Sequence, residues 1–464
     1  MSSSMFWKIF SYYLPFFYSN VFGLSLVDAG VLVLVTRIWD AVSDPMMGVI
    51  ADRTQTRWGK YRPYLLFMAA PFSIAGILLF TTPDWEYGAK LVYAYVTYIL
   101  MMTVYTGINV PYGAMLGVMT DDPQEKTVFS SFRMFFAYGG SFIALAAWEP
   151  LVNFFKTLPS GGGGSGSTAA WQHAMMVIAA ICFVLFLLTF TLTRERLRTK
   201  SSVSVGKDFK ALLSNGPWWL LIGAALCFNL FCTVRGATVA YYFADIIGFD
   251  AALNFSLFTF HFSLLFYAGL FLSVGEVANM AGVAMTVSLA RRLGKKSLFI
   301  GVNATLFVLS IAFFFIPVSP VGFWLMLLAQ VLISMLTGIM SPLVWSMYAD
   351  VSDYAELRYK TASTGLIFSS SSMAQKFGGA IGGAAVLWLL SACGYIPRTD
   401  EQQAAQALIT QPEAALQCLR YLMSFIPAAV ALLAILVCHF YPLTTTRVNE
   451  INEQLKIARN TNTF

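Results

Sequence analysis

Apolar residues in this chain gather into long runs that short polar turns separate. A helix needs about 20 apolar residues to cross a bilayer, and runs of that length recur along the 464 residues, of which 58% are hydrophobic and only 11% charged. The pattern predicts an all-α membrane protein with twelve transmembrane helices, near residues 5–23, 29–51, 63–82, 91–119, 128–154, 169–192, 216–246, 262–290, 297–317, 321–349, 362–392 and 421–441.

Basic residues are distributed unequally between the two sides of this predicted map. Twenty Lys and Arg residues fall in the turns and tail on one side, whereas the other side has four, namely Lys90, Lys156, Arg398 and Arg420. By the positive-inside rule the richer side is cytoplasmic. We therefore expect a multi-pass protein of the cell inner (plasma) membrane with both termini in the cytoplasm. The net charge of +6 then reflects orientation in the lipid bilayer rather than binding to nucleic acid.

The longest polar connection divides the predicted spans six and six. The sequence therefore predicts four parts, which are an N-terminal six-helix bundle at 1–193, a cytoplasmic linker at 194–215, a C-terminal six-helix bundle at 216–441 and a cytoplasmic tail at 442–464. A basic turn follows an early span in each half, at Asp52–Pro63 and at Ala290–Lys296. This echo indicates two related halves, an arrangement in which substrate and ion bind between the repeats.

Two aspartates lie one helical turn apart within the second predicted span. Asp40 and Asp44 share a helix face, and Arg37 points roughly the same way. A carboxylate near the bilayer centre costs about 2.5–3.5 kcal/mol, and two neighbouring like charges cost more. A proton, a bound alkali cation or Arg37 would neutralise them. The first two make the pair a site for ion-coupled transport, and the third makes it a structural Asp–Arg pair that locks two helices.

Five cations fall inside predicted spans and need partners, namely Lys8, Arg37, Arg133, Arg235 and Lys376. Lys376 has no acid in its own helix, so Asp40 or Asp44 across the bundle is the expected partner, unless the ammonium snorkels to the interface. Arg133 and Arg235 cannot shed their charge, and each needs an acid, backbone carbonyls or an anionic substrate. Five cations against two clearly central carboxylates predict a surplus of positive charge that favours an anionic ligand.

No pattern typical of an enzyme is present. The sequence has no phosphate-binding loop and no nucleophile–base pair, and its three histidines, at 173, 261 and 439, are too scattered for a metal site. We therefore expect a monomeric membrane protein that is not an enzyme, has no cofactor and handles a small-molecule substrate.

Several motifs occur together along nearly the whole chain. They are RIWDAVSDPMMGVIADRTQTRWGKYRPY from Arg37, YTGINVPYGAM from Tyr105, SFRMFFAYGG from Ser131, VRGATVAYY from Val234, WSMYADVSDYAE from Trp345, QKFGGAIGG from Gln375 and GYIP from Gly394. With these motifs the chain resembles the glycoside-pentoside-hexuronide:cation symporters, the melibiose permease group of the major facilitator superfamily. The resemblance implies a major facilitator fold and symport of a sugar with a cation by alternating access.

The resemblance also implies a cation site on the second and fourth helices. The family's helix-two carboxylates and the polar residue beside them map onto Asp40, Asp44 and Ser43, and its helix-four cation residue maps onto Thr106. The best-known member of the family has an asparagine at the position of Ser43. Because sodium favours several well-placed oxygens and this hydroxyl supplies one, the departure favours H+ over Na+ as the coupling ion.

Substrate-binding residues are implied on several helices. Tyr105 and Asn109 correspond to sugar-binding positions on the fourth helix, Arg133 to the arginine of the fifth and Lys376 to the lysine of the eleventh. Asn109 is a departure, because the melibiose-type transporter has an aspartate there. The aromatic residue that stacks on the sugar in the family is Gly113 in this chain.

Other aromatic and basic residues are candidates for the same site. Trp39 or Tyr112 is expected to replace the missing stacking residue, and Trp345 is a further candidate for a stacking face. Arg235, together with Arg133 and Lys376, would attract an anionic sugar. We therefore expect a hexuronide or sulfosugar to compete better than a neutral sugar, with neutral pentosides and glucosides as the alternative.

The first predicted helix is abbreviated relative to the family. Counting back from FGLS at Phe22–Ser25 places a sugar-binding aspartate of the family at Ser4. Two alternatives to sugar:cation symport therefore remain, which are an uncoupled sugar facilitator and a transport-inactive membrane sensor or paralogue.

Overall fold

The computed structural model describes residues 1–119, 123–157, 166–195, 213–247, 256–257, 260–261, 264–359, 364–397 and 410–460. Within these ranges the chain is almost entirely helical. The helices are α1 (Ser2–Asn20), α2 (Leu26–Arg53), α3 (Arg62–Phe67), α4 (Ala69–Leu79), α5 (Tyr87–Met119), α6 (Pro123–Thr157), α7 (Gly166–Leu192), α9 (Gly216–Tyr242), the π-helical turn η1 (Phe243–Ile247), α10 (Leu264–Leu293), α11 (Lys295–Phe314), α12 (Pro320–Tyr359), α13 (Thr364–Ala392), α15 (Glu413–Met423), α16 (Phe425–His439) and α17 (Thr445–Asn460). Two short strands, β1 (Ser256–Leu257) and β2 (Phe260–His261), pair antiparallel.

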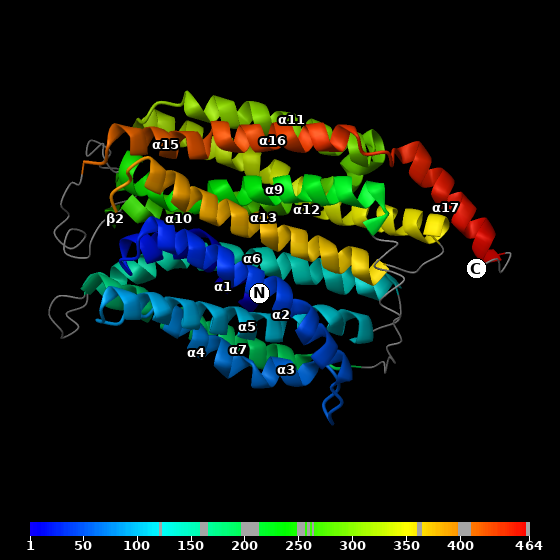
Figure 1. The fold of residues 1–464 in the computed structure, drawn as a ribbon, viewed down its shortest axis with the longest axis horizontal. Coiled ribbons are helices and arrows are strands. Elements are labelled where there is room, and N and C mark those ends of the chain that lie inside the picture. The colour runs from blue at the N-terminus through cyan, green and yellow to red at the C-terminus, as the bar shows by residue number, and fades with distance from the viewer. Residues whose placement is uncertain are drawn as a thin grey trace.

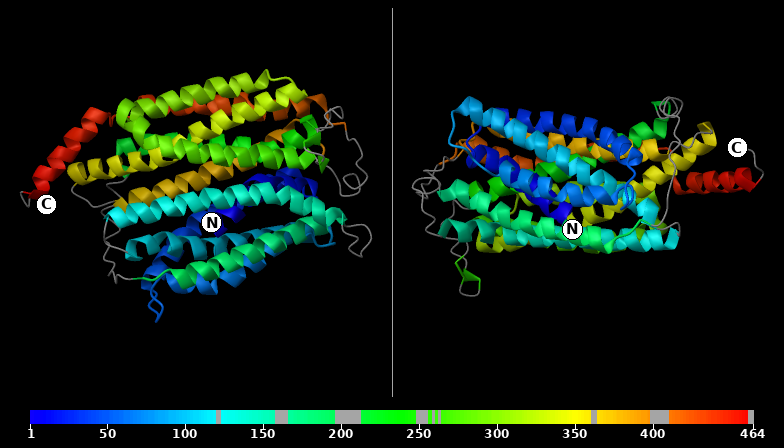
Figure 2. Two further views of the ribbon diagram at one scale, coloured as in Figure 1. Left: turned by 180° about the vertical axis from the view of Figure 1, so that it is seen from behind. Right: turned by 90° about the horizontal axis from the view of Figure 1, so that it is seen from below.

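The helices lie side by side along the longest axis of the molecule (Figure 1). Helices α1 to α7 form the lower part of this view and α9 to α16 the upper part, and the same two groups are seen from behind (Figure 2). α17 leaves this body at one end. The predicted division at a linker over 194–215 stays a prediction, because most of that segment, 196–212, lies outside the described residues.

Extensive contacts between the two groups join α2 to α13, α6 to α10 and α1 to α9. Glycines permit the closest approaches along α2 and α13. A Cβ at Gly30 would overlap the indole of Trp388, and a Cβ at Gly383 would lie 3.2 Å from Val33 Cγ1. Small residues at helix crossings let backbones approach within a membrane, where lipid removes the hydrophobic drive for helices to associate. The two groups are therefore held by shape and by polar contacts.

Local signals explain several helix ends. Ser25 caps α2, since its hydroxyl accepts a hydrogen bond from the Asp28 N–H at 3.1 Å, and Asn215 caps α9 in the same way. α3 gives way to α4 at Met68, and α15 gives way to α16 at Ser424. Pro71 and Pro427 lie in the first turn of the second helix of each pair, where a proline has no N–H for the helical hydrogen bond and its ring crowds the carbonyl four residues earlier. The predicted span 63–82 treats α3 and α4 as a single apolar run, whereas the predicted span 421–441 begins only near the end of α15.

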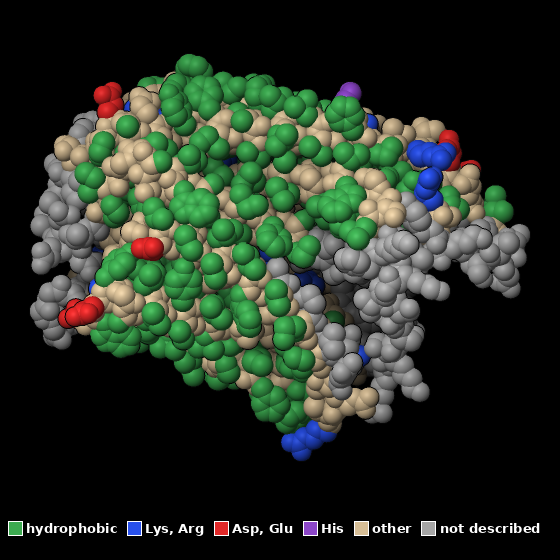
Figure 3. All heavy atoms as spheres, viewed as in Figure 1, with side chains coloured by type: hydrophobic (Ala, Val, Ile, Leu, Met, Phe, Trp, Pro, Cys, Tyr) green, Lys and Arg blue, Asp and Glu red, His purple; other side chains and the backbone are tan. Residues whose placement is uncertain are grey.

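The lateral surface of the molecule is apolar. α2 exposes Val35, Val42 and Met46, and Figure 3 shows hydrophobic side chains over most of the visible face. Among the described residues nine helical segments are long and apolar enough to cross a membrane, and they fall in α5, α6, α7, α9 with η1, α10, α11, α12, α13, and α15 with α16. The prediction of an all-α membrane protein is confirmed.

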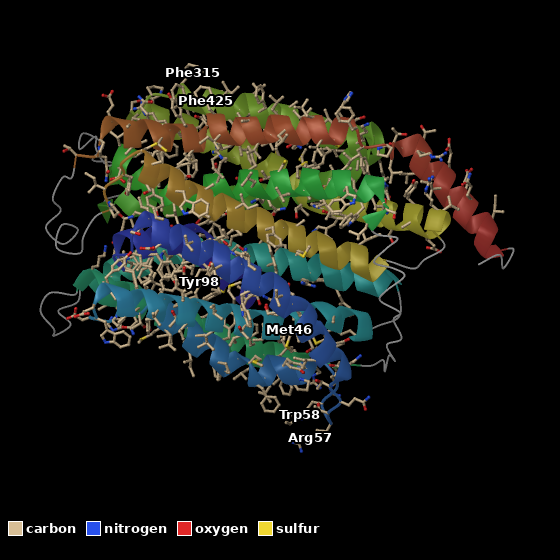
Figure 4. All side chains as sticks on the ribbon, viewed as in Figure 1. Met46, Arg57, Trp58, Tyr98, Phe315 and Phe425 are labelled. Atoms are coloured by element: carbon tan, nitrogen blue, oxygen red, sulfur yellow. The ribbon has the colours of Figure 1, made fainter. Side chains whose placement is uncertain are left out.

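A single carboxylate organises the basic turn between α2 and α3, at whose tip Arg57 and Trp58 lie (Figure 4). Glu195, which follows α7, accepts hydrogen bonds at 2.6 to 2.8 Å from the backbone N–H groups of Lys60, Tyr61 and Arg62. These groups lie at the start of α3, where backbone donors lack helical partners and the helix dipole favours negative charge. Glu195 therefore joins the end of α7 to the start of α3.

We predict that Glu195→Gln lowers the stability of the protein by about 1–3 kcal/mol, because a neutral amide with one oxygen replaces a charged acceptor with two. Thermal unfolding of the purified protein in detergent measures the change as a lower Tm. Glu450→Gln is the matched control, since Glu450 forms an exposed pair with Arg447 that contributes little. Equal Tm values for the two variants would contradict the role of Glu195.

Candidate functional site

Asp40 and Asp44 face the same threonine on α5. The side chain of Asp40 is fully buried, and that of Asp44 is 23% exposed. Thr106 Oγ1 lies 3.0 Å from Asp40 Oδ1 and 2.9 Å from Asp44 Oδ1. A threonine hydroxyl has one proton to donate. Thr106 therefore satisfies both carboxylates only when one of them is protonated and donates to the hydroxyl in return.

Lys376 of α13 reaches the aspartates from the other group of helices. Its Nζ lies 3.1 Å from Asp40 Oδ2 and also pairs with Asp44 Oδ2. The prediction that Lys376 has its acid partners on α2 is confirmed. We call Asp40, Asp44, Thr106 and Lys376 the carboxylate cluster. One ammonium balances one of the two carboxylates, so the cluster keeps one negative charge until a proton or another cation binds.

Arg37 turns away from the aspartates. Its guanidinium carbon lies 4.4 Å from the centroid of the Trp7 ring and 5.3 Å from that of Phe10, both on α1, at cation–π distance. The side chain is 6% exposed, and its Nε and Nη1 have no hydrogen-bond partner among the described residues. The predicted alternative in which Arg37 locks the aspartate pair is wrong, because the cation that contacts the carboxylates comes from α13.

The hydroxyl of Ser43 donates to its own helix. Ser43 Oγ lies 3.2 Å from the backbone carbonyl oxygen of Asp40, and the side chain is buried. Thr106 is thus the neutral side chain that the described structure places between the two carboxylates. The donor set for a cation consists of carboxylate oxygens and one hydroxyl, which are hard ligands that suit a proton or an alkali ion.

A cavity of about 270 Å³ adjoins the carboxylate cluster, and Lys376 lines it. We call it the central cavity, because α1 and α2, α5, α9 and α13 from both groups of helices surround it. Its aromatic and polar lining includes Trp7, Phe10, Arg37, Tyr98, Tyr105, Asn229, Thr233 and Gln375. Tyr98 is seen among the lower helices in Figure 4. Ring faces combined with a few hydrogen-bonding groups are typical of a site for a small hydroxylated ligand.

Two of the predicted substrate-binding residues, Tyr105 and Lys376, line the central cavity. Asn109 lies one turn beyond Tyr105 on α5 and is not among the described residues that line it. Arg133 of α6 stacks on Tyr112 of α5, with its guanidinium carbon 4.9 Å from the ring centroid. This pair also lies outside the lining of the central cavity.

The other predicted residues lie on different surfaces. Trp39 is 39% exposed on the lateral face of α2 and donates its indole N–H to Thr103 at 2.8 Å. Trp345 is half-buried in α12, with its ring centroid 6.2 Å from that of Tyr348. Arg235 of α9 lines a second cavity. The structure therefore does not bring these three side chains together with the carboxylate cluster.

The spans contain further acids besides Asp40 and Asp44. Glu276 of α10 is 2% exposed and pairs with Lys8 of α1 at 2.6 Å. Glu149 in α6 and Asp245 in η1 are 2% and 3% exposed. The predicted count of two central carboxylates is therefore too low, because these three acids are buried as well. Hydropathy windows leave these acids near the ends of the spans, whereas the packed helices bury them.

Sequence reasoning missed several residues of the central cavity. Trp7 and Tyr98 carry no signal of their own, because the chain has 40 Phe, 21 Tyr and 11 Trp residues. Asn229 and Thr233 did offer a signal, since two polar residues four apart mark one face of an otherwise apolar helix. Arg37 offered another, as a cation within a span.

Side chains from the two groups also meet at the end opposite the basic turn. Ser19 Oγ at the end of α1 lies 2.7 Å from Tyr241 Oη of α9. Trp388 of α13 donates its indole N–H to the Val27 carbonyl oxygen at 3.4 Å. We call these two hydrogen bonds the outer contact. They lie at the end where α1 finishes and α2 begins, and they join the groups there.

Known transporters are similar to this chain over nearly its whole length. The family described as MFS/sugar transport protein matches residues 1–445. Inner membrane symporter YicJ of Escherichia coli (strain K12) is 33% identical over 446 residues, which are 96% of this chain and 90% of that protein. The isoprimeverose transporter of Lactiplantibacillus pentosus is 34% identical over 404 residues, which are 86% of this chain and 79% of that protein.

Solved transporter structures share the fold at low sequence identity. The nucleoside transporter NupG superposes with a TM-score of 0.65 at 12% identity and covers 95% of this chain and 97% of its own. The D-xylose-proton symporter superposes with a TM-score of 0.61 at 16% identity and covers 95% of each chain. Such identities show the fold alone, which is the major facilitator fold.

We predict that Lys376→Gln makes the stability of the protein depend on sodium or on protons. Removal of the ammonium leaves Asp40 and Asp44 without a cation, and loss of one partner from a buried pair typically costs about 3–5 kcal/mol. The Tm in detergent should fall, and NaCl or acidic pH should restore it relative to choline chloride at neutral pH.

The matched control for this variant is Lys295→Gln. Lys295 pairs with Asp350 at 2.7 Å near the start of α11, far along the chain from the cluster. Its loss should lower the Tm without creating a response to sodium or acid. The same cation response in both variants would rule out a special role for the carboxylate cluster.

Proposed function

Because this chain belongs to the MFS/sugar transport protein family, we propose that it moves a glycoside, pentoside or hexuronide across the membrane together with a cation. Its membership of the glycoside-pentoside-hexuronide:cation symporters agrees with the sequence motifs, and it is a transporter rather than an enzyme. The main support is the position of the carboxylate cluster. Acids that can hold a cation adjoin a cavity that can hold a small substrate.

In the proposed mechanism Lys376 stands in for the coupling cation. Its ammonium contacts both carboxylates, as a bound cation would. When a proton or sodium ion binds beside Asp40 and Asp44, Lys376 no longer has to contact both carboxylates, and one of its N–H groups can turn toward the central cavity, which Lys376 already lines. A substrate oxygen can then accept a hydrogen bond from Lys376. Binding of the cation thereby favours binding of the sugar.

Alternating access is proposed from the places where the two groups of helices touch. The outer contact joins them at the end opposite the basic turn. Toward the other end, α5 and α12 form no extensive contact among the described residues. We therefore assign this arrangement to the inward-facing state. Transport requires the outer contact to open while the basic ends of the helices approach one another.

The membrane topology is proposed on the same basis. Twelve spans result when α1, α2 and the α3–α4 pair are added to the nine apolar segments. The positive-inside rule then places the basic turn and α17 in the cytoplasm, and we propose the inner (plasma) membrane as the location. An abbreviated first helix and a monomeric state remain predictions.

We propose the proton as the coupling ion. Sodium favours several oxygen ligands, and the neutral oxygen between the two carboxylates is that of Thr106. Ser43, the other candidate ligand, directs its proton to a backbone carbonyl. A proton on either carboxylate would complete the hydrogen bonds around Thr106 without further ligands.

A neutral glycoside is favoured over a sugar acid within this proposal. Arg133 stacks on Tyr112 and does not line the central cavity. The two lysines within the spans, Lys8 and Lys376, are paired with acids. Arg37 is the arginine that faces the central cavity with unpartnered N–H groups. Recognition of a hexuronide would therefore depend on Arg37 rather than on Arg133.

We predict that Asp40→Asn and Asp44→Asn each abolish sugar accumulation driven by an ion gradient, because an amide cannot carry the exchangeable charge. Exchange of sugar across the membrane without a gradient should persist. Uptake of a labelled xyloside or glucoside into proteoliposomes, with and without an imposed gradient, measures both activities. Asp28→Asn is the matched control, since Asp28 lies on the same helix outside the cluster, hydrogen-bonded to Ser25.

Two outcomes of this experiment would change the assignment. Full accumulation by Asp40→Asn or Asp44→Asn would remove the aspartates from the coupling site. Uptake by the unmodified protein that never exceeds the outside concentration would identify an uncoupled facilitator.

We predict that a protonophore abolishes accumulation at constant sodium concentration. The reason is that a proton on either carboxylate completes the hydrogen bonds around Thr106, whereas the hydroxyl of Ser43, the other candidate ligand for sodium, is directed to a backbone carbonyl. Replacing sodium by choline should leave uptake unchanged. Strict dependence on sodium at constant pH would instead show that Asp40 and Asp44 hold Na+.

A further inference from the structure

A second cavity of about 180 Å³ lies beside the central one. The two cavities share α1 and α9 as walls. Trp7 and Thr233 line the central cavity, whereas their sequence neighbours Lys8 and Cys232 line the second cavity. The remaining walls of the second cavity come from α6, α10 and α12. The second cavity is therefore built mainly by helices that the carboxylate cluster does not use.

Tyr12 of α1 lies where these two shared walls touch. Its ring lies against Gly236 of α9, where a Cβ would overlap the ring carbon Cε1, so only glycine permits this position. The Tyr12 hydroxyl accepts a hydrogen bond from Lys8 Nζ at 3.2 Å. A change of rotamer at Tyr12 would remove this contact between α1 and α9.

Glu276 presents an unsatisfied oxygen to the second cavity. The side chain is 2% exposed, and Oε1 accepts a hydrogen bond from Lys8 Nζ at 2.6 Å. Oε2 is buried and has no hydrogen-bond partner within the described structure. A buried acceptor without a donor destabilises the folded state. A ligand hydroxyl that donates to Oε2 would remove this penalty, whereas an anionic group would be repelled by it.

The rest of the lining supplies oriented polar groups and ring faces. Gln330 of α12 accepts a hydrogen bond from Arg235 Nη2 at 3.0 Å and donates one to Ser334 Oγ at 3.1 Å. These bonds fix the orientation of all three side chains. Tyr138 and Phe228 add aromatic faces. Stacking surfaces combined with fixed hydrogen-bonding groups suit a hydroxylated ring.

The sizes of the cavities also point to a shared ligand. Small-molecule pockets usually measure about 300–1,000 Å³. The central cavity, at about 270 Å³, and the second, at about 180 Å³, each fall below this range. Their combined volume falls within it. A ligand that fills both must be elongated and must pass between α1 and α9, where Tyr12 lies.

We propose that the second cavity binds one ring of a two-ring glycoside whose other ring lies in the central cavity. The proposal rests on the proposed function and extends it by assigning a second sugar subsite to α10 and α12. Glu276, Gln330 and Ser334 are its hydrogen-bonding residues. Tyr12 determines whether a bound sugar extends into it, so a one-ring sugar occupies the central cavity alone.

Isothermal titration of the purified full chain in detergent tests this assignment with matched pairs of sugars. The pairs are methyl β-D-xyloside with xylobiose, and methyl β-D-glucoside with cellobiose. In at least one pair the two-ring sugar should bind at least about tenfold more tightly, which corresponds to about 1.4 kcal/mol. Glu276→Gln, which keeps the size of the side chain and replaces an acceptor oxygen by a donor, should remove most of this advantage. The Kd of the one-ring sugar should not change.

A second variant and a control accompany Glu276→Gln. Ser334→Ala leaves the Lys8–Glu276 pair intact and should weaken the two-ring sugar about threefold. Glu149→Gln is the matched control, because Glu149 is another carboxylate of 2% exposure within the spans, hydrogen-bonded to Tyr13 and outside the lining of both cavities. It should leave the preference for two rings unchanged.

The outcomes separate this inference from the proposed function. A two-ring sugar that binds no more tightly than its one-ring partner would overturn the second subsite and leave sugar transport intact. Equal weakening of both sugars by Glu276→Gln and Ser334→Ala would do the same. Absence of binding and of uptake for every sugar in a wider panel would overturn the proposed function together with the subsite.

Discussion

Two carboxylates on one turn of a membrane helix set the strongest constraint on this structure. Asp40 and Asp44 cannot both stay charged in a low-dielectric core without a cation beside them, and the described structure meets that need from the other group of helices through Lys376. A lysine can reach both acids only if α13 lies close along α2, and Gly30 and Gly383 permit that approach. The electrostatic requirement and the close helix crossing therefore depend on each other.

The contacts between the two groups of helices are polar in several places. Besides the carboxylate cluster they include the Lys8–Glu276 ion pair and the hydrogen bond between Ser19 and Tyr241. Buried ion pairs add little net stability, because desolvation offsets much of their attraction. They do fix a geometry, and water or a ligand can replace each partner when the groups separate. An interface of this kind supports two alternative arrangements, whereas an extensive apolar interface would favour only one.

Much of the fold follows from hydropathy, and part of the site follows from the cost of buried charge. Apolar runs of about 20 residues predict the helices, because a helix satisfies all its backbone hydrogen bonds within the lipid. The pairing of Lys376 with α2 follows because a lysine within a span needs an acid partner. The position of Arg37 does not follow. Helical periodicity fixes the direction of its Cβ, but the long side chain reaches Trp7 on another helix. The burial of Glu276 could not be predicted either. A hydropathy window gives the length of a span, but it does not show whether a residue in it faces the interior of the helix bundle or lies near the end of the span.

The charge of the carboxylate cluster bears on the stoichiometry of the proposed symport. With Lys376 in place the cluster carries one net negative charge, and Arg37 holds its own charge on the ring of Trp7. One proton or one monovalent cation brings the cluster to neutrality, and a second would leave it positive in a low-dielectric site. One cation for each sugar is therefore the favoured ratio. If the cation frees Lys376 to bind the sugar, linkage requires the sugar to raise the affinity for the cation by the same factor.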